Sequence, residues 1–273
     1  MRLRRRTAPE PAPAPERYDH FLAAVDVPAD PHDADDDLWA LLLTRQYDGY
    51  QDVAAQLPAV PEPAFQELWN GASGARLTAQ TLAFYRELKP FLTDGARVLD
   101  FGCGWGRITR FLARDVPPER LFACDPVQGI LDECERNGVR ATFACSDAHS
   151  DRLPFDEPLD LAFAFSVFTH LSEPAHERAL DALHAGLRPR GTLVVTVRPP
   201  GHVGEPPGTP FAFVAHPPDE RHFQWDGGEM HYGDTVITLD YVRERWAPRF
   251  ELQRAKLLVN DLAQVVLVLR RQG

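Results

Sequence analysis

Three glycines at alternate positions follow an apolar run in the stretch RVLDFGCGWGR, residues 97–107. Glycines at this spacing allow a tight turn and let a ligand approach the backbone closely. The dinucleotide fingerprint is G-x-G-x-x-G, but here Gly106 comes one residue early and Arg107 fills the expected place. Asp100, just before the turn, suits a ligand amino group better than a pyrophosphate. The pattern therefore indicates a nucleoside-like ligand that carries an amine and no diphosphate.

Two further carboxylates end the next two predicted strands. Asp125 ends LFACD, 23 residues after Gly102, and could accept hydrogen bonds from both ribose hydroxyls or cap the following helix. Asp147 in SDAHSDRLPF could accept from the exocyclic amine of adenine or cap a local turn. Because the carboxyl ends of strands in an open α/β sheet line the ligand crevice, the three acids are expected to share one site.

The elements that must position these acids alternate between strands and helices from residue 96 onward. This alternation predicts βαβ units and a doubly wound parallel sheet. Two terminal strands, RFELQRAKLLV and LAQVVLVLRR, are expected to form an antiparallel pair. Strands are predicted at 96–102, 121–125, 141–147, 159–167 and 191–197, and helices at 107–114, 127–138 and 174–187.

Three regions are distinguished along the chain. Residues 1–36 are rich in proline and charge and are expected to form a disordered tail. Residues 37–92 are expected to form an N-terminal helical cap, with helical stretches at 38–57 and 77–92 and a Gly- and Ser-rich loop over 68–76. Residues 93–273 are expected to form one Rossmann-like domain.

The alternation of predicted strands and helices is interrupted at residues 199–233, which contain four of the ten histidines. We predict an irregular insertion, either a substrate lid or a passive surface loop, after which the chain resumes with a helix in GDTVITLDYVRERW. Its aromatic residues could wall an apolar pocket or form a small core of the loop itself; they are Phe211, Phe213, Phe223, Trp225 and Tyr232.

Composition excludes some classes of function. The formal net charge of −11 argues against a nucleic-acid substrate, since phosphate binding relies on basic residues. The sequence has neither an apolar run of membrane-spanning length nor an apolar signal segment, so no membrane association and a cytoplasmic location are expected. The four cysteines lack CxxC spacing and are expected to be small buried apolar residues rather than disulfide partners or zinc ligands.

Residues 69–200 resemble a class I S-adenosylmethionine-dependent methyltransferase, through VLDFGCGWGR, FACDP, CSDAHSDRLPF and FAFSVFTHL. The chain from GDTVITLDYVRERW onward resembles the tail of small-molecule members, including bacterial sugar and natural-product methyltransferases. The resemblance implies an α/β, Rossmann-like doubly wound sheet of seven strands with the last one antiparallel. It also implies S-adenosylmethionine as the methyl donor, with S-adenosylhomocysteine as the product.

The resemblance assigns parts of this cofactor to particular residues. The methionine moiety would lie along Asp100, Gly102, Cys103 and Gly104, with Phe165 and Ser166 beside it. The ribose would meet Asp125, the adenine would meet Asp147 and Ala148, and Pro126 is a further cofactor-binding residue. Trp69 and Arg76 are further candidates, Arg76 as a partner of the methionine carboxylate.

Methyl transfer from a sulfonium is an in-line displacement in which the enzyme mainly positions the acceptor. A hydroxyl acceptor benefits from a base, and His170, directly after the fourth strand, is the first candidate; alternatively it only shapes the cleft. His202, His216, His222 and His231 in the insertion are further candidates. A metal site built from them with Asp226 and Glu229 is not expected, because no pair has clear ligand spacing.

The expected reaction is O-methylation of a small molecule, a sugar or a secondary metabolite. N- or C-methylation of a natural product or a protein is the alternative within the same chemistry. The alternatives from other classes are an NAD(P)-dependent oxidoreductase and a catalytically inactive binding protein. The sequence is compatible with a homodimer. The misplaced third glycine and Asp100 argue against a nicotinamide site.

Overall fold

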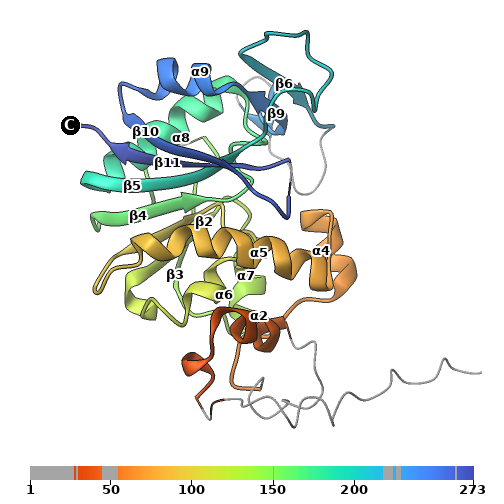
Figure 1. Cartoon of the computed structure of the whole chain (residues 1–273), viewed down its shortest axis with the longest axis vertical. Coiled ribbons are helices and arrows are strands. Elements are labelled where there is room, and N and C mark those ends of the chain that lie inside the picture. The colour runs from red at the N-terminus through yellow and green to blue at the C-terminus, as the bar shows by residue number, and fades with distance from the viewer. Residues whose placement is uncertain are drawn as a thin grey trace, which may run out of the picture.

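The core of the protein is a sheet of seven strands in the order β10-β11-β5-β4-β1-β2-β3 (Figure 1). This is a computed structural model, and it describes residues 28, 30–44, 55–149, 151–217, 224–225, 229–261 and 263–273, with backbone only at 224, 225 and 229. The strands are β1 (Val98–Phe101), β2 (Leu121–Asp125), β3 (Thr142–Cys145), β4 (Leu159–Ala164), β5 (Leu187–Val197), β10 (Phe250–Leu257) and β11 (Val265–Arg271).

One strand of this sheet runs against the others. β11 pairs antiparallel with both β5 and β10, whereas β1 through β5 pair in parallel. The predicted doubly wound sheet of seven strands with an antiparallel last strand is therefore confirmed. Its parallel strands bring their carboxyl ends to one edge, where the predicted acids lie.

Helices cover both faces of the sheet. They are α2 (Asp36–Thr44), α4 (Pro63–Asn70), α5 (Gly74–Leu88), α6 (Thr109–Leu112), α7 (Gln128–Arg136), α8 (Glu173–Gly186) and α9 (Leu239–Tyr241), which runs into a π-helical turn at Val242–Trp246. Short 3-10 turns lie at Pro31–Asp33, Lys89–Phe91 and Pro118–Arg120. Among the described residues, no helix is both long and apolar enough to cross a membrane.

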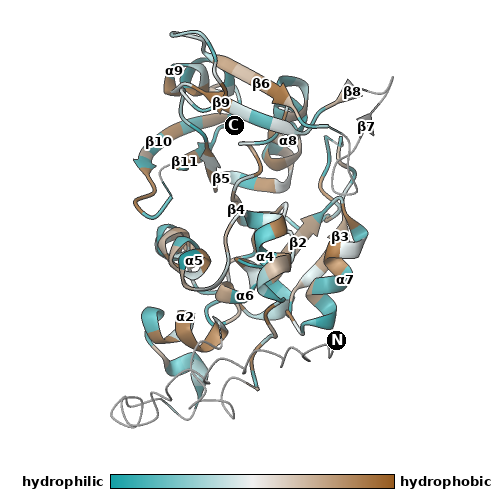
Figure 2. Ribbon diagram, turned by 90° about the vertical axis from the view of Figure 1, so that its right-hand side faces the viewer, coloured by the Kyte–Doolittle hydropathy of each residue, from teal (hydrophilic) through white to brown (hydrophobic). Residues whose placement is uncertain are grey.

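Successive residues of the central strands point to opposite faces of the sheet and pack in two separate hydrophobic cores, as the pleat of a strand requires. Val98 on β1 packs in the core shared with α2, α5 and α6, while its neighbour Leu99 packs in the core shared with α8 and the π-helical turn. Phe163 and Ala164 on β4 divide in the same way. The apolar helix α2 lies beside α5 rather than apart from the domain (Figure 2).

Two predictions for the N-terminal region need correction. The predicted loop over 68–76 is limited to residues 71–73, because α4 continues to Asn70 and α5 begins at Gly74. Gly71 ends α4 in the left-handed conformation, with φ of 66°, which stops that helix sharply. Of the predicted helix over 38–57, the structure has α2; residues 45–54 lie outside the described residues.

The prediction of an irregular insertion at 199–233 was wrong in part, because this segment contains short strands. β6 (Phe211–Ala215) pairs antiparallel with β9 (Gly233–Ile237), and β7 (Gln224–Trp225) pairs with β8 (Glu229–Met230). The helix expected to open GDTVITLDYVRERW begins only at Leu239, because the β-branched run Thr235–Ile237 favours a strand. One cysteine also departs from expectation, since Cys145 is exposed at the end of edge strand β3, while the other three are buried.

Candidate functional site

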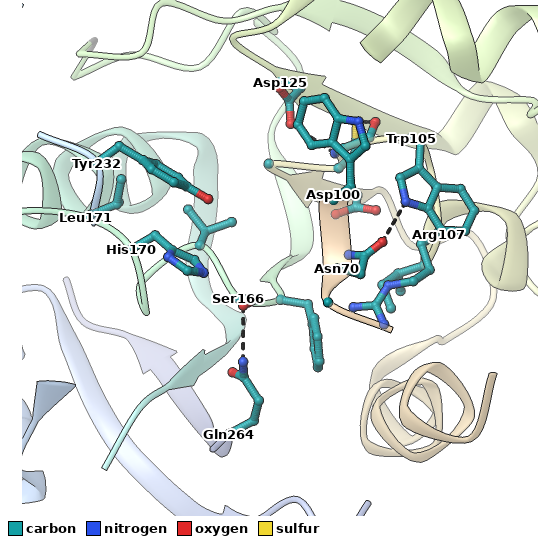
Figure 3. Close-up of a pocket in the computed structure, with 18 of the residues that line it drawn as sticks. Asn70, Asp100, Trp105, Arg107, Asp125, Ser166, His170, Leu171, Tyr232 and Gln264 are labelled. Carbon is teal, nitrogen blue, oxygen red and sulfur yellow. Dashed lines mark hydrogen bonds between the residues drawn. The ribbon is translucent and has the colours of Figure 1, made fainter. Parts of the chain in front are cut away.

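A cavity of about 560 Å³ opens at the carboxyl ends of β1, β2, β4 and β5. This volume lies within the range that small-molecule and cofactor sites occupy. Its walls come from the glycine loop, the α4–α5 junction, the insertion and the loop between β10 and β11. In Figure 3, His170 and Tyr232 line one side, and Trp105 and Arg107 line the other.

The glycine loop leaves the backbone bare beside this cavity. The backbone N–H groups of Gly102 and Cys103 both donate to the carbonyl of Cys124, which ties the loop to β2. Gly104 has φ of 52°, and a Cβ at this position would meet no other atom within 4 Å. A side chain on Gly104 would therefore project into open space, as expected where a ligand approaches the backbone.

Asp125 ends β2 and is tied to the same loop. Its Oδ2 accepts from the backbone N–H of Gly104 at 2.9 Å, and its Oδ1 accepts from that of Val127 at 3.0 Å. Burial raises the pKa of Asp125 to about 6, although the two backbone donors act in the opposite direction. A carboxylate offers about four acceptor positions, so two remain for ligand hydroxyls.

Asp100 is the most deeply buried acid of the cavity wall, with 2% of its surface exposed. Burial raises its pKa to about 7, although the hydroxyl of Thr109, which donates to it at 2.6 Å, acts in the opposite direction. At neutral pH the Asp100 carboxyl group is thus protonated in a large fraction of the unliganded molecules. A ligand ammonium placed beside it would favour the ionised form.

Arg107 occupies the position where a dinucleotide fingerprint has its third glycine. Its guanidinium is buried and lies 4.6 Å from the ring centre of Phe165. Burial lowers the pKa of Arg107 to about 10, so it stays charged at neutral pH, with Asp100 and Asp261 near enough to stabilise the charge. The methionine end of the predicted ligand would meet a cation here in addition to Arg76.

Ser166, two residues past the end of β4, adopts a left-handed backbone with φ of 60°. This conformation costs free energy for a residue other than glycine and persists where neighbours fix it. Its backbone N–H donates to Thr196 Oγ1 at 2.7 Å, and its Oγ lies 3.0 Å from Thr169 Oγ1. The Nε2 of Gln264 donates to the same Oγ at 3.1 Å (Figure 3). Four side chains from three parts of the chain thus meet at this corner.

His170 lines the cavity with a defined tautomer. Its Nδ1 lies 2.6 Å from the carbonyl oxygen of Gly233, which can only accept, so Nδ1 carries the hydrogen and Nε2 is left as an acceptor. Burial lowers the pKa of His170 to about 4. The ring of Tyr232 stacks on the imidazole at 5.0 Å between centres. His170 is therefore neutral at physiological pH and a weak base.

A cation is fixed in the cavity wall beside the insertion. Arg198 follows β5, and its Nη1 donates to Asp234 Oδ1 at 2.5 Å. His216 Nε2 lies 2.9 Å from the other oxygen of the same carboxylate. Burial would raise the pKa of Asp234, but hydrogen bonds from His216 and Arg198 outweigh it and hold the pKa below its usual range. Arg198 and His216 face the cavity, with Asp234 behind them.

The cavity brings together most of the residues predicted from the sequence. Those that line it are Trp69, Arg76, Asp100, Gly102, Cys103, Gly104, Asp125, Pro126, Ala148, Phe165, Ser166, His170, His216, His231 and Tyr232.

Other predicted residues lie elsewhere. Asp147 is exposed and accepts from the backbone N–H of His149, the local cap that was its alternative role. His202 is exposed, with Nδ1 on the carbonyl of Pro199. Phe211 packs against His176 and Tyr241 in the core of the insertion side. His222, Phe223 and Asp226 lie outside the described residues, as do the side chains of Trp225 and Glu229.

Several lining residues were missed by the sequence reasoning. Asn70, whose Oδ1 accepts from Trp105 Nε1 at 2.7 Å, ends α4 within the stretch predicted to be a loop. Arg198 directly follows β5, so the rule that located the three acids could have found it. Asp261 and Gln264 lie on the loop between the last two strands, and no local pattern marks them.

Comparison with known families agrees with this architecture. Residues 98–191 match the family described as a methyltransferase domain. The chain is 31% identical over 129 residues to trans-aconitate 2-methyltransferase of Variovorax paradoxus, covering 46% of this chain and 49% of the relative. It is 32% identical over 157 residues to the enzyme of that name from Streptomyces avermitilis, covering 55% of each. The chain thus spans about half the length of the curated relatives it matches.

Solved structures share the fold. A S-adenosylmethionine-dependent methyltransferase from Clostridium acetobutylicum superposes with a TM-score of 0.55 at 14% identity, covering 77% of this chain and 97% of that one. The glycopeptide N-methyltransferase MtfA complexed with sinefungin gives a TM-score of 0.53 at 13% identity, covering 71% and 94%. At such identities the similarity establishes the fold alone.

Proposed function

We propose that the chain, whose residues 98–191 match the methyltransferase domain family, is a class I S-adenosylmethionine-dependent methyltransferase that transfers a methyl group to a small-molecule acceptor. One observation carries the proposal: Asp125 bonds directly to the bare backbone at Gly104, within one cavity. A ribose acid and an unobstructed glycine loop side by side suit an adenosine that bears an amino acid.

The residues present fit this cofactor. Gly104 leaves room along the backbone, and Asp125 has free acceptor positions for the ribose hydroxyls. Asp100 would face the ammonium group, and Arg76 or Arg107 the carboxylate. Pro126 and Ala148 would flank the adenine, whereas the exposed Asp147 would reach it only at its edge. When bound, the cofactor supplies an electrophilic methyl group on a sulfonium sulfur.

Oxygen is the acceptor atom we propose, on a carboxylate rather than on a sugar hydroxyl. A carboxylate needs no base, whereas a hydroxyl does, and a pKa of about 4 makes His170 a poor base. Arg198, held by Asp234, suits recognition of an anionic group at the acceptor side. The curated relatives named trans-aconitate 2-methyltransferase are also consistent with an acidic acceptor.

Two measurements test the proposal in sequence. The first is calorimetric titration with S-adenosylhomocysteine and, in parallel, with NADH; we expect micromolar binding of the former and none of the latter. Binding of NADH alone would mean that the glycine loop serves an oxidoreductase.

The second measurement is methyl transfer from labelled S-adenosylmethionine to a panel of carboxylic acids, sugars and amines. A methyl ester is released by mild base, while a methyl ether or a methylamine is not. Base-labile label is the expected product. Base-stable label on a sugar would indicate methylation of a hydroxyl group. Base-stable label on an amine would indicate N-methylation. Arg198→Met should weaken transfer to acids without changing the affinity for S-adenosylhomocysteine.

A further inference from the structure

The side-chain amide of Gln264 is buried in the cavity wall, and its carbonyl oxygen has no hydrogen-bond partner among the described residues. Only 5% of the residue is exposed, and Nε2 donates to Ser166 Oγ at 3.1 Å. Its Oε1 is buried and has no partner within the part of the chain that the structure describes. Buried carbonyl oxygens in proteins almost always have a donor, and Gln264 is a residue of the cavity wall, so the missing donor is sought on the ligand.

Hydrogen bonds of the surrounding residues fix the orientation of the Gln264 amide. The backbone N–H of Gln264 donates to the carbonyl of Asp261, and its carbonyl accepts from Leu258, each at 2.9 Å, which closes the loop between β10 and β11. On the other side, Ser166 is anchored to Thr169 and Thr196, both fully buried. The amide therefore cannot turn outward to find water without breaking its bond to Ser166.

The position of Gln264 separates it from the cofactor residues. In Figure 3, Asp100 and Asp125 lie on one side of Ser166 and Gln264 on the opposite side. The acids are where the adenosine and its ammonium group would bind, so Gln264 faces the remaining part of the cavity. That part is where an acceptor must enter to meet the methyl group in line.

We propose that Gln264 determines acceptor specificity: its Oε1 accepts a hydrogen bond from an alcohol hydroxyl on a carboxylic acid that is methylated at its carboxylate. This inference rests on the proposed function. A carboxylate cannot donate to Oε1, so an acid without a hydroxyl would leave this oxygen unpaired. Sites built to bond a substrate hydroxyl discriminate strongly against the analogue that lacks it.

The test uses pairs of acids that differ only in one hydroxyl: citrate and tricarballylate, malate and succinate, and lactate and propionate. Each is titrated calorimetrically into the protein saturated with S-adenosylhomocysteine, so the readout is binding and does not depend on turnover. We expect the hydroxylated member of at least one pair to bind about tenfold or more tightly. In Gln264→Met, which keeps the length of the side chain, that preference should shrink to about twofold.

Controls separate this inference from the function on which it rests. Gln253→Met, on the exposed face of β10, should change nothing. Ser166→Gly accepts the left-handed backbone but removes the Oγ that holds the amide, so it should weaken the preference in part. Gln264→Met should bind S-adenosylhomocysteine as the wild type does, which also reports that it folds.

The remaining outcomes each contradict the inference. It is wrong if no pair shows a hydroxyl preference in the wild type, or if the preference persists in Gln264→Met. Equal loss of both members of a pair would mean that the amide nitrogen serves a carboxylate. Loss of affinity for S-adenosylhomocysteine in Gln264→Met would assign the residue to the cofactor. A wild type that does not bind S-adenosylhomocysteine would instead refute the proposed function itself.

Discussion

Asp125 Oδ2 accepts a hydrogen bond from the backbone N–H of Gly104 at 2.9 Å, across two neighbouring strands of the sheet. The acid that would hold the ribose thus also shapes the loop that would hold the methionine moiety. Its second oxygen accepts from the backbone N–H of Val127, the residue before α7, so the side chain that would bind the ribose also orders the entry to that helix. The two roles that the sequence suggests for Asp125 do not exclude each other.

Asp125→Ala should weaken S-adenosylhomocysteine binding by about tenfold to a hundredfold. The substitution removes the acceptor for both ribose hydroxyls and leaves the N–H of Gly104 without its partner, a loss of roughly 1–3 kcal/mol. Calorimetric titration measures it. Asp132→Ala, which removes an exposed carboxylate from α7, is the matched control and should leave the affinity unchanged. Unchanged affinity in Asp125→Ala would remove this residue from the site.

Gly104→Ala should lower the affinity for S-adenosylhomocysteine, while Gly138→Ala should not. Both glycines have positive φ, 52° and 72°, and neither would place a Cβ within 4 Å of another atom. Each variant should therefore lose a similar free energy of unfolding, about 1–2 kcal/mol, for a left-handed alanine. Only the methyl group at Gly104 would project into the cavity. Urea unfolding and calorimetry on both variants separate strain from obstruction, and equal affinities would contradict a ligand lying against Gly104.

The strand-end rule explains why much of this site could be read from the sequence. Asp125 ends β2 and Asp100 is the last residue but one of β1, and parallel strands bring such ends to one edge. Asp147 instead lies two residues beyond β3, where its exposed carboxylate accepts from the backbone N–H of His149 in a local turn. Residues just past a strand are thus less predictable than the residues that end it.

Long-range pairing accounts for what the sequence did not reveal. Gln264 donates a hydrogen bond to Ser166, which lies 98 positions earlier in the chain. Neither residue belongs to a local sequence pattern that would predict this contact. The strands β7 and β8 have two residues each, too short for any alternation of apolar and polar residues to appear. The prediction of a helix in GDTVITLDYVRERW was wrong for its first residues, because the β-branched residues of β9 favour a strand, and α9 begins only at Leu239.

Asp100 should make the unliganded protein less stable as pH rises. Its pKa is about 7 in the folded state and about 3.9 in an unfolded chain, so between these values the folded state binds more protons. The free energy of unfolding therefore falls as pH increases from about 4 to about 7, and the full loss is present above that range. Asp100→Asn should reduce this slope in urea unfolding measured at several pH values. An identical slope in wild type and variant would mean that Asp100 ionises normally.

The same group should couple ligand binding to proton release. An ammonium group beside Asp100 favours the ionised carboxylate, so S-adenosylhomocysteine should displace a proton near pH 6.5 and bind more tightly toward pH 8. Calorimetry in two buffers with different ionisation enthalpies measures the number of protons released. Asp125, with a pKa of about 6, also titrates in this range, so Asp100→Asn is compared with the wild type to isolate the share of Asp100. No release in the wild type would place the ammonium group elsewhere.

His170→Asn should reduce kcat by less than about tenfold if the acceptor atom is a carboxylate oxygen, because removal of a true general base costs about a hundredfold or more. Asparagine can keep the donor to the carbonyl of Gly233 and removes only the acceptor Nε2. With the cofactor saturating, kcat of the wild type should also be flat between about pH 6 and 9, since the pKa of His170 is about 4. The assay uses the best acid of the acceptor panel, with His202→Asn, outside the cavity, as the control. A hundredfold loss confined to His170→Asn, together with a base-stable product, would make His170 the base of a hydroxyl methyltransferase and reverse the choice of acceptor.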